Sequence, residues 1–245
     1  MSFTNSPLVT YTNITKNKTV NRNHAIDTIT IHCIVGQWTA KQGCDYFATT
    51  NKKCSANYVV GKDGSIGLSV DEKDRSWCSS NAANDHRAIT IEVASDTKAP
   101  YAVTDQAYKA LIQLIADICK RNNIKELKWK ADPSLIGQVD KQNMTVHQWF
   151  AKKDCPGAYL YERHSDIASK VNALLKAQIL PTRALKVGST VRLKKGAKTF
   201  QGGNLASFVY ERDHQVKQIN VDRVVITYNG IVVAAVRKSD LTVIN

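Results

Sequence analysis

The stretch Asp27–Val35 reads DTITIHCIV, which is rich in β-branched residues and alternates between polar and apolar side chains over its first half. A second stretch, Ala88–Ala94, reads AITIEVA and has the same alternation. Both patterns predict β-strands. Between them, Asn57–Gly61 and Ser65–Ser69 flank the pair Asp63-Gly64, which is the strongest short-range signal for a β-hairpin in the chain.

Helical patterns alternate with these strands along the first two thirds of the chain. Thr39–Thr50 predicts a helix, and Thr104–Asn122 predicts a longer one that Thr104 caps, with apolar residues repeating at helical spacing. A further amphipathic helix is expected from about Tyr159 to Gln178. Strands interleaved with helices indicate an α/β domain.

The pattern changes after Leu180-Pro181. Leu185–Asn245 contains short β-rich pieces (TVRL, SFVY, QVKQI, RVVIT and IVVAAV) separated by turn signals such as Asn229-Gly230. Short strands at close spacing predict a small β-barrel of about 60 residues. We therefore expect two domains, residues 1–180 and 186–245.

Charge and composition limit the possible functions. The 245 residues include 34 basic and 21 acidic ones, for a net charge of +13, which favours polyanionic partners such as nucleic acid, anionic lipid or phosphate-bearing wall polymers. No apolar run reaches the length of a membrane helix, and the polar N-terminus lacks the apolar core of a signal peptide. The six cysteines form no CxxC pair, so most are expected to be reduced and buried.

Three segments carry side chains that are suited to metal binding or catalysis. His32 ends the first strand, His147 precedes Cys155 by eight residues in HQWFAKKDCPG, and Glu92 lies within an apolar strand. Each has an ordinary alternative: His32 as a hydrogen-bonded core residue, Cys155 as a buried thiol, and Glu92 on the polar face of its strand.

Taken together, these residues are typical of a catalytic zinc site. Zinc binds His nitrogen and Cys thiolate, and a catalytic site uses three protein ligands and one open position. His32, His147 and Cys155 supply three ligands, and Glu92 remains as a proton acceptor. A zinc-bound water has a pKa near 7, and the metal polarises a carbonyl.

In these segments the chain resembles the zinc-dependent N-acetylmuramoyl-L-alanine amidases of phage endolysins, bacterial autolysins and animal peptidoglycan-recognition proteins. The resemblance extends from about Asp27 to Leu175 and rests on TITIHC, SANYVVGKDGSI, AITIEVA and HQWFAKKDCPG. It implies a mixed central sheet flanked by helices, zinc as the cofactor, and hydrolysis of the bond between N-acetylmuramic acid and L-alanine in bacterial peptidoglycan.

The resemblance also assigns roles to residues. It implies that zinc is bound by His32, His147 and Cys155, and it places Lys153 near the reacting carbonyl. Some family members use a tyrosine as the base, but the corresponding position in this chain is Ala56, with Tyr58 two residues late. Others use a glutamate in the strand that matches AITIEVA, so Glu92 is the expected general base and acid.

The C-terminal segment resembles the bacterial SH3-like domains of endolysins, which implies a cell-wall-binding domain. Its aromatic residues are expected either to stack on wall sugars or peptides or to fill a small core: Phe200, Phe208, Tyr210 and Tyr228. With no signal peptide, the protein is expected to be a phage or prophage endolysin, made in the host cytoplasm and acting at the wall after release; an autolysin exported by another route fits equally.

Two other functions explain part of the sequence. A non-catalytic peptidoglycan-binding protein accounts for the fold and charge but not for Cys155 together with Glu92. A Cys–His cell-wall hydrolase is possible because SH3-like modules also accompany such enzymes. Nucleic acid and membrane are not expected as partners, because no nucleic-acid-binding signature or membrane segment is present. The oligomeric state is left open.

Overall fold

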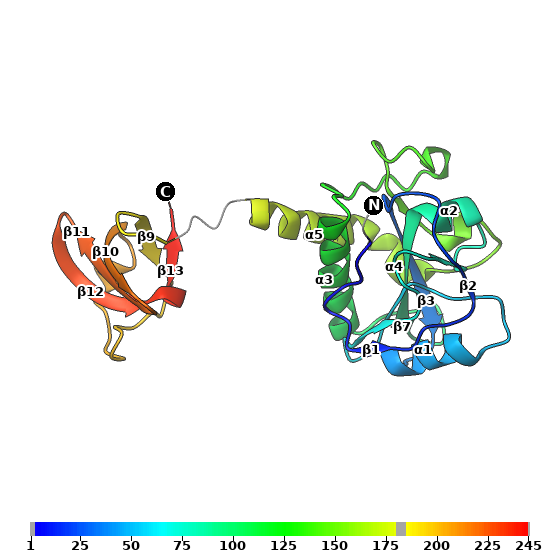
Figure 1. Ribbon diagram of the computed structural model, residues 1–245, viewed down its shortest axis with the longest axis horizontal. Helices are drawn as coiled ribbons and strands as arrows, with labels where there is room; N and C mark the ends of the chain where they lie inside the picture. The colour runs from blue at the N-terminus through cyan, green and yellow to red at the C-terminus, as the bar shows by residue number, and fades with distance from the viewer. Residues whose placement is uncertain (1–2, 180–184, 245) are drawn as a thin grey trace. The chain divides into compact units, whose positions relative to one another are not determined.

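The computed structural model describes residues 3–179 and 185–244 and divides into two units, Met1–Lys176 and Ala177–Asn245 (Figure 1). The predicted domain boundary at 180–186, including Leu180-Pro181, falls mostly on residues 180–184, which lie outside the described residues. None of the helices in the described ranges is long and apolar enough to cross a membrane.

A mixed six-stranded sheet forms the centre of the first unit, in the order β1-β5-β4-β7-β3-β8. Its two longest strands, β3 (Thr28–Val35) and β7 (Ala88–Ser95), are adjacent, parallel and in register along their whole length. The remaining strands are β1 (Tyr11–Thr12), β4 (Tyr58–Val60), β5 (Ile66–Leu68) and β8 (Met144–Thr145). The predicted hairpin is confirmed, because β4 and β5 are antiparallel and Gly64 takes φ +80° in the turn.

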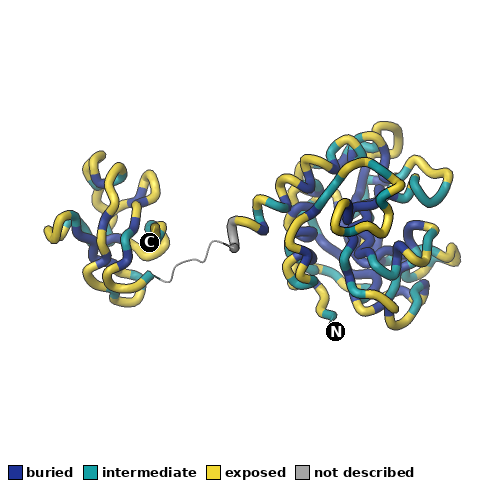
Figure 2. Tube along the Cα trace, turned by 90° about the horizontal axis from the view of Figure 1, so that it is seen from above, coloured by how far each residue is buried: buried dark blue, intermediate teal, exposed yellow. Residues whose placement is uncertain are grey.

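These two long strands are more deeply buried than their alternating sequence indicates. In β3 every residue from Thr28 to Cys33 is buried, including the polar ones. A parallel sheet is covered on both faces, so its strands have no solvent-facing side. Figure 2 shows this buried trace running through the middle of the unit.

Helices cover both faces of the sheet. On one face, α3 (Asp105–Arg121) and α5 (His164–Ile179) join the isoleucines of β3 and β7 in the main hydrophobic core. On the other face, α1 (Ala40–Thr49) packs Cys44 and Phe47 against Val59 of β4. The predicted cap is present, since Thr104 Oγ1 accepts a hydrogen bond from Ala107 N. Thr39, which was not predicted as a cap, forms a capping box with Gln42.

The prediction of one continuous helix from about Tyr159 to Gln178 is wrong. The segment forms α4 (Gly157–Glu162) and α5, which meet at Arg163. The Leu160 carbonyl accepts hydrogen bonds from the Arg163 backbone N–H and from Nδ1 of the buried His164 ring, at 3.0 and 2.8 Å. The ring thereby takes the carbonyl to which the backbone N–H of residue 164 would donate in a continuous α-helix. A short helix, α2 (Ala82–Arg87), was not predicted.

The second unit is a five-stranded antiparallel sheet in the order β12-β11-β10-β9-β13. Its strands are β9 (Thr190–Leu193), β10 (His214–Asn220), β11 (Arg223–Tyr228), β12 (Ile231–Arg237) and β13 (Leu241–Val243). Asn229 and Gly230 both take positive φ in the β11–β12 turn, as their sequence predicts.

One of the five β-rich pieces of this unit is not a strand. SFVY lies in a 3₁₀ turn, Ser207–Val209, in which only Val209 is buried. The following Tyr210 donates its hydroxyl to the Ala197 carbonyl and packs against the unit's core. A strand needs a hydrogen-bonded neighbour as well as suitable residues, and in this unit the neighbouring strands pair with one another instead.

Candidate active site and metal centre

Three metal-binding side chains converge at one edge of the central sheet. His32 lies near the end of β3, and His147 begins a 3₁₀ turn (His147–Trp149) directly after β8, which runs parallel to β3. Cys155 lies in the loop before α4. Their ligand atoms all lie within 4.8 Å of one another.

The geometry of this cluster fits zinc. Tetrahedral zinc, with Zn–N near 2.1 Å and Zn–S near 2.3 Å, places N and S ligand atoms roughly 3.5 Å apart. In this cluster His32 Nδ1 lies 3.3 Å from Cys155 Sγ, and the His32 and His147 ring centroids lie 5.1 Å apart. Burial, together with the neighbouring His147, lowers the pKa of His32 to about 3. Burial and then the charge of Lys153 lower the pKa of His147, so both rings are neutral at pH 7, which is the form of histidine that can bind a metal.

Cys155 is not an activated thiol in the absence of a cation. Its hydrogen bond with the Cys33 side chain, then burial, then the charge of Glu92 raise the pKa of Cys155 well above its ordinary value. A nucleophilic cysteine requires the opposite shift. A bound cation would convert this thiol to the thiolate, because metal binding displaces the proton of its ligand.

Glu92 lies beside His32, at the paired position on β7. Its side chain is half-buried, and its Oε2 is shielded from solvent with no hydrogen-bond partner in the described part of the chain. Burial raises the pKa of Glu92 to about 7, and the contact with the Cys78 thiol at 3.8 Å opposes this shift weakly. A carboxyl group with this pKa can accept or donate a proton near neutral pH.

The other candidate site residues have less direct contact with the cluster. Lys153 is exposed and forms no hydrogen bond with the described residues, yet it is near enough to lower the pKa of His147. Tyr58 points away from the cluster: its buried hydroxyl donates to Glu72 at 2.6 Å. The Asn57 amide bonds backbone atoms of the segment that follows β5. Neither residue offers an alternative base to Glu92.

A buried polar network, which the sequence did not indicate, joins β3, which carries His32, to β8, which ends just before His147. Asn84 of α2 donates to Thr30, two residues before His32, and accepts from Thr145, two residues before His147, at 3.1 and 2.9 Å. The two threonine hydroxyls lie 2.7 Å apart. In the sequence, each histidine is preceded two positions earlier by a threonine (TxH). This spacing does not show that Thr30, Thr145 and Asn84 contact one another in the fold.

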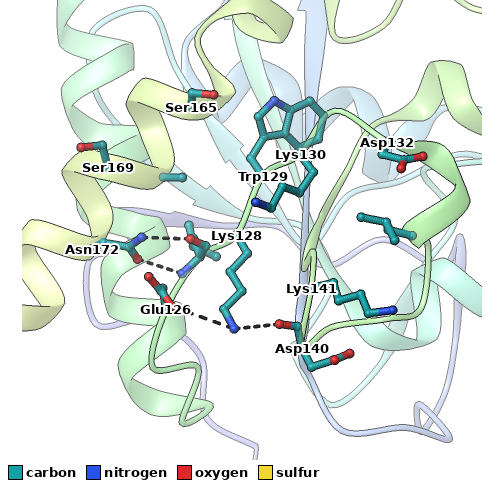
Figure 3. Close-up of a pocket in the computed structure, with 13 residues that line it drawn as sticks. Glu126, Lys128, Trp129, Lys130, Asp132, Asp140, Lys141, Ser165, Ser169 and Asn172 are labelled. Carbon is teal, nitrogen blue, oxygen red and sulfur yellow. Dashed lines mark hydrogen bonds and ion pairs between the residues drawn. The ribbon is translucent and has the colours of Figure 1, made fainter.

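An aromatic cavity of about 410 Å³ adjoins the cluster. Its lining includes both Glu92 and His147, and its walls come from Trp38, Tyr46, Phe47 and Trp77. A larger cavity of about 740 Å³ lies elsewhere, between α5 and residues 126–141 (Figure 3). There, Asn172 bonds the Leu127 backbone and Lys128 bonds the Asp140 carbonyl, so much of its polar lining is already paired. The smaller cavity is therefore the candidate substrate site.

Comparison with known families agrees with this geometry. The family model described as N-acetylmuramoyl-L-alanine amidase matches residues 22–158, which include all the residues of the metal cluster and Glu92. The chain belongs to this family. It is an amidase, and the matched range contains the central sheet from β3 to β8 and the start of α4.

Two solved structures, those of PlyL and AmpD, show the same fold at low sequence identity. The structure of PlyL is 16% identical and has a TM-score of 0.51, and the match covers 66% of this amidase and 95% of PlyL. A selenomethionine derivative of AmpD is 18% identical, with a TM-score of 0.51 and coverage of 69% and 99%. An endolysin amidase, LysCS from Clostridium intestinale, is 18% identical over 68% and 96% of the two chains, with a TM-score of 0.47. No curated protein sequence matches the chain.

Proposed function

We propose that this amidase is a zinc-dependent endolysin that hydrolyses the bond between N-acetylmuramic acid and L-alanine in bacterial peptidoglycan. The observation that carries the proposal is the convergence of His32, His147 and Cys155 within 4.8 Å, beside the shielded carboxylate of Glu92. A binding-only protein has no need of a buried carboxyl with a raised pKa next to a metal-binding cluster. The raised pKa of Cys155 counts against a Cys–His thiol hydrolase.

Each residue of the site has a separate role in the proposed reaction. His32, His147 and Cys155 would hold zinc, which supplies a Lewis acid that activates water and polarises the scissile carbonyl. Glu92 takes the proton from the attacking water and returns it to the leaving amine of L-alanine. The exposed ammonium of Lys153 supports the negative charge that develops on the carbonyl oxygen. The aromatic cavity beside Glu92 holds the sugar or peptide next to this bond.

A digest of purified cell wall tests which bond is cut. The protein should release new L-alanine amino groups without new reducing sugars, because only the amide at the lactyl group is hydrolysed. New reducing ends would instead indicate a glycosidase, and new amino groups on other residues would indicate a peptidase. Wall incubated with buffer alone serves as the control for spontaneous release.

We propose that the second unit is an SH3-like domain that holds the enzyme on anionic wall polymers. Residues 185–245 contain ten basic and four acidic residues, and two of those acids, Asp213 and Asp222, are already paired with arginines. Arg212 lies over the rings of both Phe208 and Tyr228, at 5.2 and 4.8 Å. Its guanidinium has no carboxylate partner among residues 185–244, so its hydrogen-bond donors are available to phosphate or carboxylate groups.

Arg212→Gln in the full chain should reduce co-sedimentation with intact walls, and more so than Arg223→Gln. Both changes remove one positive charge, but only Arg212 contacts aromatic rings, whereas Arg223 is an exposed arginine on β11. Binding should also weaken with added salt. Hydrolysis of small soluble muropeptides should be unchanged, because the second unit supplies no residue of the metal cluster. Equal losses for the two variants would show that general charge, and not this surface, mediates binding.

A further inference from the structure

The loop before α2 carries a side chain that contacts one of the proposed metal ligands. Ser80 Oγ lies 3.0 Å from Nε2 of His147. Ser80 also takes φ +61°, in the left-handed region that residues other than glycine rarely adopt. Backbone strain of this kind persists where surrounding contacts fix the conformation, and it concentrates at functional sites.

Those contacts come from the start of α2. The Asp85 carboxylate accepts hydrogen bonds from the backbone N–H groups of Cys78 and Ser79, at 3.0 and 3.2 Å, and from the Ser79 hydroxyl. Asn84 donates to the same hydroxyl at 3.1 Å. Because Asn84 also bonds Thr30 and Thr145, the loop is tied to the two strands that precede His32 and His147.

The contact with Ser80 bears on which ring nitrogen of His147 can bind a metal. A neutral imidazole has one N–H donor and one nitrogen lone pair. If Nε2–H donates to Ser80, the lone pair lies on Nδ1, which has no hydrogen-bond partner within residues 3–179 and 185–244. Ligating histidines commonly donate their other N–H to such a partner, which fixes the tautomer and the ring orientation.

We propose that Ser80 is a positioning residue of the metal centre: its hydroxyl holds the His147 ring so that Nδ1 faces the cation. The inference rests on the zinc dependence proposed above. It extends the site to a residue that lies 67 positions from His147 in the sequence.

Two substitutions separate this role from a merely structural one. Ser80→Ala and Ser80→Gly both remove the hydroxyl, but glycine also relieves the strain of the positive φ. We expect both variants to bind zinc and cobalt(II) roughly 10- to 100-fold more weakly, the usual effect of losing such a partner. The visible absorption of the cobalt(II) form should shift, and metal-free Ser80→Gly should melt no lower than the wild type. Ser169→Ala, an exposed serine of α5, is the matched control and should change none of these readouts.

Each outcome gives a distinct answer. A wild-type protein that binds neither metal contradicts both the proposed zinc dependence and the role of Ser80. A wild type that binds metal, with both Ser80 variants binding as tightly and with the same cobalt spectrum, overturns the role of Ser80 alone. Weaker binding by Ser80→Ala with normal binding by Ser80→Gly also overturns it, because the backbone strain and not the hydroxyl would then be responsible.

Discussion

Glu92→Gln should retain the fold and the metal but lower the turnover of wall fragments by roughly 10²- to 10⁴-fold, the usual contribution of general acid–base catalysis. Glutamine preserves the shape of the side chain and cannot take a proton from water. Oε2 of Glu92 has no hydrogen-bond partner in the described part of the chain, so an amide nitrogen at its position leaves the contact between Oε1 and the Cys78 thiol intact. Steady-state kinetics on a soluble muropeptide, with metal content measured on the same sample, checks this expectation.

The pH profile provides a second readout of the same variant. The base must be ionised to accept a proton, so the wild-type rate should fall as the pH drops through the pKa of Glu92. That pKa is about 7 from burial, and the positive charge of a bound cation would move it lower. The acidic limb of the profile should therefore lie at or below about pH 7 and should disappear in Glu92→Gln. Glu126→Gln, at an exposed glutamate, is the control; a Glu92→Gln enzyme with the wild-type rate would exclude Glu92 as the base.

Cys155→Ser should abolish activity through loss of the metal. A neutral hydroxyl is a poor substitute for a thiolate ligand. Residues that only hydrogen bond to metal ligands already contribute about 10- to 100-fold to metal affinity. Because Cys155 is itself a proposed ligand, we expect zinc to bind more than about 100-fold more weakly to the variant. Elemental analysis after dialysis against a weak chelator measures this directly.

Cys33→Ser is the matched control for this substitution. Cys33 hydrogen bonds with Cys155 but is not one of the clustered ligands, so its variant should keep the metal. A thiol hydrolase would also lose activity in Cys155→Ser, but its metal content would not change. An inactive Cys155→Ser protein with the full wild-type zinc content would therefore contradict zinc ligation by Cys155 and favour a nucleophilic thiol.

The sequence predicted those parts of the fold that depend on local pattern. The strands around His32 and Glu92, the hairpin at Asp63-Gly64 and the capped helix after Thr104 all combine hydrophobic periodicity with a specific turn or capping residue. These signals are short-range, and the tertiary structure agrees with each of them.

The break between α4 and α5 escaped prediction because the His164 ring bonds the Leu160 carbonyl, a local contact that a helical pattern does not reveal. The other features that escaped prediction depend on contacts between residues that are distant in the sequence. SFVY has strand-forming residues but no neighbouring strand to pair with. The shielding of Glu92, which raises its pKa, follows from the layers packed on both faces of the sheet and not from the sequence of its own strand. Ser80 meets His147 only because Asp85 and Asn84 hold its loop in place.

Zinc titration of the metal-free protein tests the central claim most directly. Protein stripped with a strong chelator should release no L-alanine amino groups from purified wall. Activity should then rise in proportion to added zinc and reach a plateau at one zinc per chain, since His32, His147 and Cys155 form a single three-ligand site. Full activity of the stripped protein in excess chelator would contradict zinc-dependent hydrolysis.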